Sequence, residues 1–387
     1  MPVSVVVVSL LAAGCTGIPA PGEKSARDDL DAVTKQYRPD QQPPALPELT
    51  GDSSLSNYLA FALFNQPQVA AAYYDWTASV ENITVTRSLP DPQFTFQAYI
   101  ENSLTSLMPG LSQQIPGPGK LKARGRAAAA ASEGKYFAFE SVVLQTAFAV
   151  KTAYYQLGLL EEKLRLKRAI IVLLQNQERV ISAQNTAGAT TLTEGLRAQS
   201  ELDRARNDLA SLEDSRRALC EKFKAALGLT PQQPASPVPA HFEFTVENLD
   251  ENELLRSAFA RNPQLAAMAA EVRTTEAGIA VAYKERVPDF NAGLMVEIYK
   301  PPFYWPQVGM TLPIWRDKLA AEIAQAKANE LAAQARWQSA QIGLAVNFAQ
   351  KSFAYRETGR NLALIENKLL PQAQQSLAAI RAGYRTG

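Results

Sequence analysis

The chain has 387 residues, of which 47% are hydrophobic and 20% charged, and its formal net charge is +1. That balance excludes the basic surface of a nucleic-acid-binding protein and the acidic composition of a charged tail. No run of apolar residues approaches the roughly 20 that a membrane-spanning helix needs. The length permits two or three domains, so the organisation has to come from patterns along the chain.

Residues 1–15 are typical of an export signal. The apolar run 5–11 is followed by the small residues of Leu11-Ala-Ala-Gly14-Cys15. A cysteine directly after small residues resembles a bacterial lipoprotein signal, in which Cys15 becomes the acylated N-terminus and lipid anchor. Ala12 stands where leucine is usual, and residues 1–4 carry no positive charge. An ordinary cleaved signal is therefore the alternative.

Residues 16–51 contain six prolines and few large apolar side chains. This composition predicts an extended tether. A helical pattern then begins near Leu55, breaks at Asn65-Gln-Pro67, and resumes over 69–83. The proline suits the first turn of the resumed helix, where a missing N–H costs nothing.

The hydrophobic period changes from helical to alternating after the prolines at 90 and 92. One face carries the apolar residues Phe94, Phe96, Ala98 and Ile100, and the other face carries Thr95, Gln97 and Tyr99. A less clear strand follows over 111–115. We therefore expect strands within about 93–115, with one apolar face.

No proline occurs between Pro118 and Pro231, and strong helix formers dominate that stretch. Apolar heptads lie on both sides of a small, polar segment around Gly188. The pattern predicts two antiparallel helices over about 120–227, with their tip near Gly188. The first would be on the order of 100 Å long, so its apolar seam must pack against other helices.

The connector over 230–249 is rich in proline and contains the only histidine, His241. A lone histidine in a linker is more often solvated than a metal ligand. Cys220 lies beside a heptad position, where it is expected to be buried. No nucleophile–base pair, Cys/His spacing or glycine-rich phosphate loop is present, so we expect no enzyme activity, no metal site and no cofactor.

The chain then repeats its landmarks. Residues 261–267 resemble residues 65–71, and Pro288-Asp-Phe290 resembles Pro92-Gln-Phe94. Both similarities occur at a spacing of 196 residues. This duplication predicts a first repeat over 52–229 and a second over 250–387, each with the order helix, strand, strand, long helix. The second strand pair is expected over about 289–312 and the second long helix over about 318–383.

Two strands per repeat give four per chain, which cannot close into a barrel. An open four-stranded sheet with an apolar face would leave exposed edges. The predicted strands are about as long as tilted membrane strands, and the aromatic segment 303–305 suits a membrane interface. Closing a barrel therefore requires more than one chain.

At these landmarks the chain resembles the outer membrane efflux protein family, the TolC-like channels of Gram-negative tripartite exporters. The resemblance covers nearly everything after about residue 52, and residues 113–124 resemble the branch serving heavy-metal exporters. It rests on two proline-containing helix starts, two strand entries and two tips: Gln66-Pro67-Gln68-Val69, Asn262-Pro263-Gln264-Leu265, Leu89-Pro90, Val287-Pro288, 188–194 and Tyr384-Arg-Thr-Gly387.

The resemblance implies a mainly α-helical homotrimer with a small membrane β part. Four strands from each chain would form a twelve-stranded barrel in the outer membrane, and the long helices an α-barrel across the periplasm. It implies a passive conduit for small-molecule or metal-ion export, in contact with outer membrane lipid. A periplasmic adaptor and an inner-membrane pump, most simply of the RND type, would be the partners.

The resemblance and the strand pattern together assign candidate site residues. The helix tips, which would bind the adaptor, contain Gly188, Thr191, Glu194, Tyr384 and Gly387. Helix capping alone also accounts for the tip glycines. The strand positions expected to face the lumen are Thr95, Gln97, Tyr99, Asn291 and Glu297.

The alternative function is that of a periplasmic adaptor, which also carries a long helical hairpin and often a lipid anchor. An adaptor flanks a single hairpin with β-rich half-motifs, however, and does not duplicate the helix-strand-strand-helix order found here. A purely structural coiled coil would lack the strands. The second long helix reaches Gly387 without a return helix, so we expect the native reading frame to continue with one.

Overall fold

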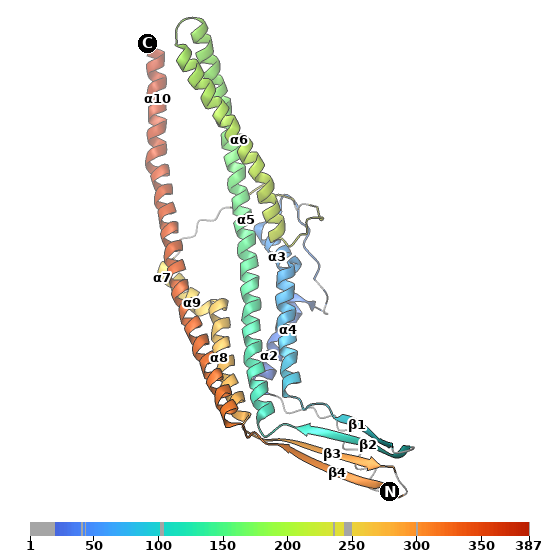
Figure 1. Cartoon of the computed structure of the whole chain (residues 1–387). Helices are drawn as coiled ribbons and strands as arrows, with labels where there is room; N and C mark the ends of the chain where they lie inside the picture. The colour runs from blue at the N-terminus through green and yellow to red at the C-terminus, as the bar shows by residue number, and fades with distance from the viewer. Residues whose placement is uncertain are drawn as a thin grey trace. The chain divides into compact units, whose positions relative to one another are not determined.

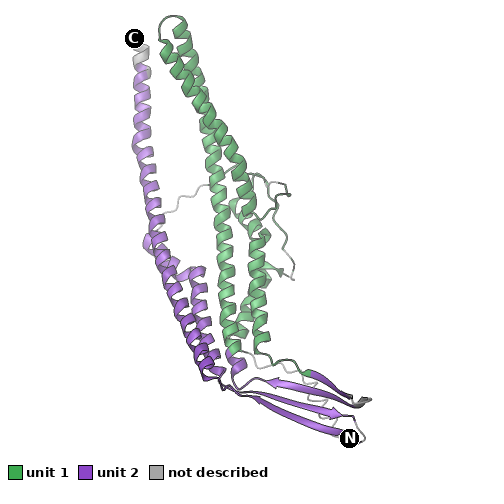
Figure 2. Cartoon of the chain, in the orientation of Figure 1, with its two compact units in different colours: residues 1–93, 124–246 green, residues 94–123, 247–387 purple. Residues whose placement is uncertain are grey.

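The structure is a computed structural model that describes residues 20–39, 42, 44–100, 104–234, 237–243, 250–298 and 301–386. As predicted, the chain is mainly helical with one small four-stranded sheet (Figure 1). It forms two compact units, which Figure 2 colours separately. The first unit comprises residues 1–93 and 124–246, and the second comprises 94–123 and 247–387.

The first unit is built on a helical hairpin. Helix α5 (Lys120–Thr186), apart from its first turn, lies in this unit with α6 (Leu192–Ala226). Gly188 adopts a φ of 73° at the tip, and the Thr191 hydroxyl accepts a hydrogen bond from the Glu194 N–H, which caps α6. The seam between the helices buries the side chains of Ile171, Leu202 and Ala205.

Two shorter helices, α3 (Leu55–Asn65) and α4 (Pro67–Arg87), meet at Gln66. Pro67 occupies the first turn of α4, where its missing N–H leaves no carbonyl unpaired. The break also holds the end of α6, because the Asn65 side-chain amide donates to the carbonyl of Leu227 at 2.9 Å. One interruption of the helical pattern therefore serves two elements.

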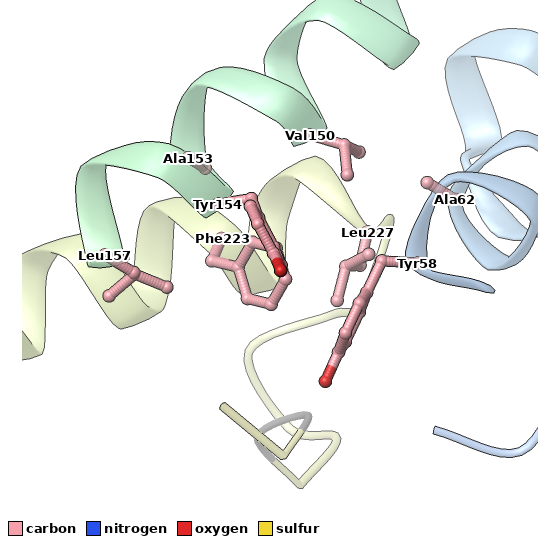
Figure 3. Packing of buried hydrophobic residues seen from close by; sticks show 8 residues of the cluster. All are labelled: Tyr58, Ala62, Val150, Ala153, Tyr154, Leu157, Phe223 and Leu227. Carbon is pink, nitrogen blue, oxygen red and sulfur yellow. The ribbon is translucent and has the colours of Figure 1, made fainter. Parts of the chain in front are cut away.

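Aromatic side chains fill the core where α3 packs on the hairpin (Figure 3). The Tyr58 hydroxyl shares its one hydrogen between the carbonyl oxygens of Thr50 and Pro237, at 3.0 and 2.9 Å, so this buried polar group is satisfied. Its ring lies 5.2 Å from that of Phe223. The buried cluster comprises Tyr58, Ala62, Val150, Ala153, Tyr154, Leu157, Phe223 and Leu227.

The expected extended tether over 16–51 is wrong for its middle part, which forms helix α2 (Glu23–Tyr37) on α4. An apolar stripe with helical spacing drives this packing, and the surrounding prolines obscured it. The stripe consists of Ala26, Leu30, Val33 and Tyr37, which join a core with Trp76 and Phe139. Arg27 and Arg87 add ion pairs between α2 and α4.

The second unit repeats the helix order of the first. Helix α7 (Glu251–Arg261) is followed by α8 (Pro263–Lys284), with Asn262 between them. The Asn262 side-chain oxygen accepts hydrogen bonds from the N–H groups of Gln264 and Leu265, at 2.9 and 3.1 Å, and so caps α8. Helix α8 packs along α9 (Arg316–Leu364) (Figure 1).

The second long helix, expected as one element over 318–383, is interrupted. Helix α9 ends at Leu364, Ile365–Leu369 form a π-helical turn, and α10 (Leu370–Thr386) continues. Pro371 accounts for the change, because it has no N–H to donate and its ring crowds the carbonyl one turn earlier. The inserted residue of a π turn accommodates that ring.

The sheet belongs to the second unit and combines strands of both repeats. Its order is β1-β2-β3-β4, with β1 Gln93–Ile100, β2 Leu104–Ile115, β3 Asp289–Glu297 and β4 Phe303–Thr311. Strands β2 and β3 pair antiparallel, so the two repeats join through this central pair. Strands β1 and β4 are left at the edges (Figure 1).

Candidate functional site

No group of three or more His, Cys, Asp or Glu residues in the described part of the chain could hold a metal ion. Among the helices that the structure describes, none is long and apolar enough to cross a membrane. The surfaces that remain as candidates are the two faces of the sheet and the tip of the α5–α6 hairpin.

One face of the sheet, here called the apolar face, follows from the strand register. Phe290 pairs with Met310, Ala292 with Val308, and Leu294 with Leu111 of β2. These side chains share one side because paired residues point to the same face and alternate residues repeat it. Val308 is 86% exposed and Phe290 is 40% exposed, so this face is open in the single chain.

The opposite side, here called the polar face, carries the residues between them. Asn291 pairs with Gly309 and Gly293 with Gln307. The Gln307 side-chain amide donates to the Met295 sulfur at 2.9 Å. The indole N–H of Trp305 donates to Glu297 at 3.4 Å. Trp305 therefore lies on the polar face, and the expected membrane interface around the aromatic segment 303–305 stays a prediction.

Strand β1 extends the same two faces. A Cβ on Gly110 would lie 2.9 Å from the Thr95 hydroxyl and 2.6 Å from Met295 Cγ, so these residues share the polar face. Alternation then places Gln97 and Tyr99 with Thr95. The polar face thus brings together Thr95, Gln97, Tyr99, Asn291 and Glu297. Their shared face is a finding, and their orientation to a lumen stays a prediction.

An ion-pair clasp holds the root of the sheet. The Lys120 ammonium, only 3% exposed, lies 2.9 Å from Asp289 Oδ2 and 3.2 Å from Glu285 Oε2. The backbone N–H of Gly117 donates to Asp289 Oδ1 at 2.7 Å. Two carboxylates compensate the buried charge, as burial requires. The clasp fixes the start of α5 against the start of β3.

Sequence reasoning missed this clasp. Lys120 and Asp289 lie in repeated landmarks, which was the only available signal, but they are far apart in the chain. The ion pair could be recognised only from the β2–β3 register, which places the end of β2 beside the start of β3.

The hairpin tip is polar and open. Gly188, Thr191 and Glu194 are all exposed, and no atom lies within 4 Å of a Cβ placed on Gly188. The Thr190 hydroxyl donates to the Glu194 carboxylate, so the tip is ordered by its own hydrogen bonds. Tyr384 lies in α10, whereas Gly387 and Cys15 are outside the described residues. The described residues therefore include one of the two predicted tips, that of the α5–α6 hairpin.

Comparison with known proteins complements this geometry. The profile of the family described as "Outer membrane efflux protein" matches residues 59–229 and 254–387. A search among curated protein sequences gives no match.

Solved structures of similar fold include three outer membrane proteins. The outer-membrane channel OprN shares 15% identity at a TM-score of 0.71, over 89% of this chain and 85% of its own. The MtrE channel of Neisseria gonorrhoeae, in its open state, shares 17% identity at 0.70, over 89% and 88%. VceC of Vibrio cholerae shares 14% at 0.69, over 86% of both chains. At such identities the likeness shows the fold.

Proposed function

The chain belongs to the outer membrane efflux protein family, whose members are channels rather than enzymes, and we propose that it is the outer membrane conduit of a tripartite exporter. In this proposal an inner-membrane pump, most simply of the RND type, supplies the energy. A periplasmic adaptor connects that pump to the conduit. The chain itself then needs a lumen and a gate, and no catalytic residue.

The observation that carries the proposal is the two-faced sheet. Its apolar face leaves Phe290, Leu294 and Val308 exposed in the single chain, which is unfavourable in water by about 1 kcal/mol or more for each large side chain. Contact with outer membrane lipid removes that penalty. The polar face, with Asn291 and Glu297, then lines a water-filled lumen.

Closure of the sheet requires further copies of the chain. Strands β1 and β4 each have one edge without a partner strand among the described residues. In lipid those backbone groups must be satisfied, because water is absent. Three copies supply twelve strands, an even number within the range of closed outer membrane barrels. A homotrimer is thus the simplest assembly.

The exposed tip around Gly188 is the proposed contact with the adaptor. Thr191 and Glu194 offer hydrogen-bonding groups there, and Tyr384 and Gly387 belong to the corresponding end of the second repeat. Cys15 is the proposed lipid anchor. A palmitate analogue should label the full-length protein and leave Cys15→Ser unlabelled, and equal labelling of both would contradict the anchor.

Electrical recording tests the proposed conduit. The purified full-length protein is added to a planar bilayer, and heat-unfolded protein serves as the control. We expect stepwise conductance from the folded protein alone. Glu297→Gln should also reduce the preference for cations, because a lumen carboxylate attracts them. Absence of conductance from protein that is folded and oligomeric would contradict the proposal.

A further inference from the structure

Strands β1 and β4 have edges that the described part of the chain does not cover, and the internal repeat predicts what covers them. We propose that β4 of one copy pairs antiparallel with β1 of a second copy, in the register that places Gly309 opposite Gln97. The inference rests on the proposed function, because it assumes that copies of the chain close the sheet. It adds which residues meet at the junction.

The chain forms one junction of this kind within itself. Strand β2 ends the first repeat's strand pair and β3 begins the second, and their register is observed. Ser112 pairs with Gly293, Gln113 with Ala292, and Gln114 with Asn291. A junction between copies would again join the last strand of one repeat to the first strand of another. The same backbone geometry should therefore recur there.

The repeat supplies the equivalent positions. Phe94 of β1 recurs as Phe290 of β3, 196 residues later. Ile115-Pro116 at the end of β2 recurs as Leu312-Pro313, 197 residues later. The offset therefore changes by one residue between these two landmarks. These offsets convert each observed pair into a predicted one.

Three predicted pairs follow directly from the three observed ones. Ser112 with Gly293 becomes Gly309 with Gln97. Gln113 with Ala292 becomes Met310 with Phe96, and Gln114 with Asn291 becomes Thr311 with Thr95. The conversion uses only the register and the two offsets, and no property of the side chains.

The chemistry of the pairs is an independent check on this register. Met310 lies on the apolar face and meets Phe96, which alternation also assigns to that face. Thr311 and Thr95 form a Thr–Thr pair, which is favourable across strands. A slip of one residue would instead set Met310 opposite Gln97 or Thr95. The side chains of the slipped strand would then point to the opposite face of the sheet, which would set apolar residues among polar ones.

Space at Gly309 also fits. A Cβ placed there would meet only Asn291 within 4 Å, at an ordinary contact distance of 3.8 Å. The edge side of Gly309 is therefore open, with room for the Gln97 side chain of a second copy. In the conversion Gly309 corresponds to Ser112 and Gln97 corresponds to Gly293, so the observed pair and the predicted pair each set one glycine opposite one polar residue.

Disulfide trapping tests the register in full-length protein. Cys220, the free thiol in the described part of the chain, is first replaced in Cys220→Ser. Gly309→Cys is then combined with Gln97→Cys, the predicted partner. The matched controls combine Gly309→Cys with Thr95→Cys or with Tyr99→Cys, which lie two residues away on the same face. Directly opposed Cα atoms lie about 4.5–5.5 Å apart, within disulfide range, whereas diagonal ones do not.

The expected result is oxidation of the predicted pair to covalent oligomers at least about tenfold faster than either control. Thr311→Cys with Thr95→Cys should behave like the predicted pair, which covers the case that Gly309→Cys fails to fold. Faster trapping of a diagonal control would overturn the register. If native mass spectrometry still finds the oligomer in that case, the proposed conduit stands. If no oligomer forms at all, the proposed conduit fails as well.

Discussion

Glu23 is buried at the start of α2, and its carboxylate receives hydrogen bonds from three residues. The Arg87 guanidinium donates at 2.5 and 3.0 Å, the Thr84 hydroxyl at 2.8 Å and the Ala20 N–H at 3.0 Å. The Arg87 contact is the main cause that lowers the pKa of Glu23 to about 2, against the opposing effect of burial. The ionised form therefore holds α2 on α4.

This contact predicts an acid-sensitive attachment of α2. Because the folded-state pKa is lowered, the stabilisation is present above the ordinary pKa of 4.5 and is lost as the pH falls toward 2. Glu23→Gln should lower the melting temperature at about pH 6. On acidification to about pH 3, the melting temperature of this variant should fall by less than that of the unmodified protein. The matched control is Asp28→Asn, on the exposed side of α2. An equal effect of both variants would contradict this role of Glu23.

Gly228 and Gly188 both have a left-handed φ, of 75° and 73°, but they differ in the space around them. A Cβ at Gly228 would lie 2.7 Å from Gln66 Cα and 2.9 Å from the Asn65 carbonyl oxygen, whereas the space at Gly188 is open. Gly188→Ala should lower the free energy of unfolding by about 1 kcal/mol through backbone strain alone. Gly228→Ala should cost about 2–4 kcal/mol.

Chemical unfolding of the two glycine variants measures this difference. A loss at Gly228 no larger than that at Gly188 would contradict the close approach of the α3–α4 break to the end of α6. Gly188→Ala thus isolates the backbone strain that both positions share.

Alternation along a strand is local, so the sequence alone predicted that Thr95, Gln97 and Tyr99 share a face. The clasp of Lys120 with Asp289 is not local. It depends on a register between strands that are far apart in the chain, and a pattern within one strand carries no such information. The helix caps at Thr191 and Asn262 are local as well, but it is the geometry that establishes them.

At the scale of elements, the sheet predicts a difference between neighbouring residues of β1. Phe96 is 59% exposed and lies on the apolar face, whereas Gln97 lies on the polar face. Phe96→Asp should impair membrane insertion, because a carboxylate on the lipid face costs up to about 2 kcal/mol according to its depth. Gln97→Asp should insert like the unmodified protein, since water reaches a lumen side chain.

The fraction of heat-modifiable, folded protein in isolated outer membranes measures insertion of the two variants. The pair is matched in chemistry and differs by one position, so general damage to the strand affects both. Equal insertion of Phe96→Asp and Gln97→Asp would show that the facing assignment is wrong.

Element prediction failed where composition hid a pattern. The prolines on both sides of α2 favoured an extended tether, although Leu30 and Tyr37 have the spacing of a buried helical stripe. In the second long helix, Pro371 lies within a continuous helical pattern. The helix does not end there but continues through a π-helical turn. Both features depend on packing or backbone adjustment, which residue counts do not contain.

In the whole molecule, the order of helices and strands could be predicted mainly from the internal duplication. Landmarks such as Pro67 and Pro263 recur at one spacing, and both begin helices that follow a break. Because each repeat supplies two strands, the four-stranded sheet followed from the sequence. Which face meets lipid depends on copies that are outside a single chain, so it could not follow from the pattern alone.

Native mass spectrometry of the full-length protein in detergent tests whether copies of this chain close the sheet. The chain has a mass of 42.2 kDa, and closure by three copies predicts one dominant species at three chain masses, with intact β signal in circular dichroism. Gly309 and Gln97 would then lie at each junction. A stable monomer that keeps its β signal would contradict the account, because its sheet would be complete without a second copy.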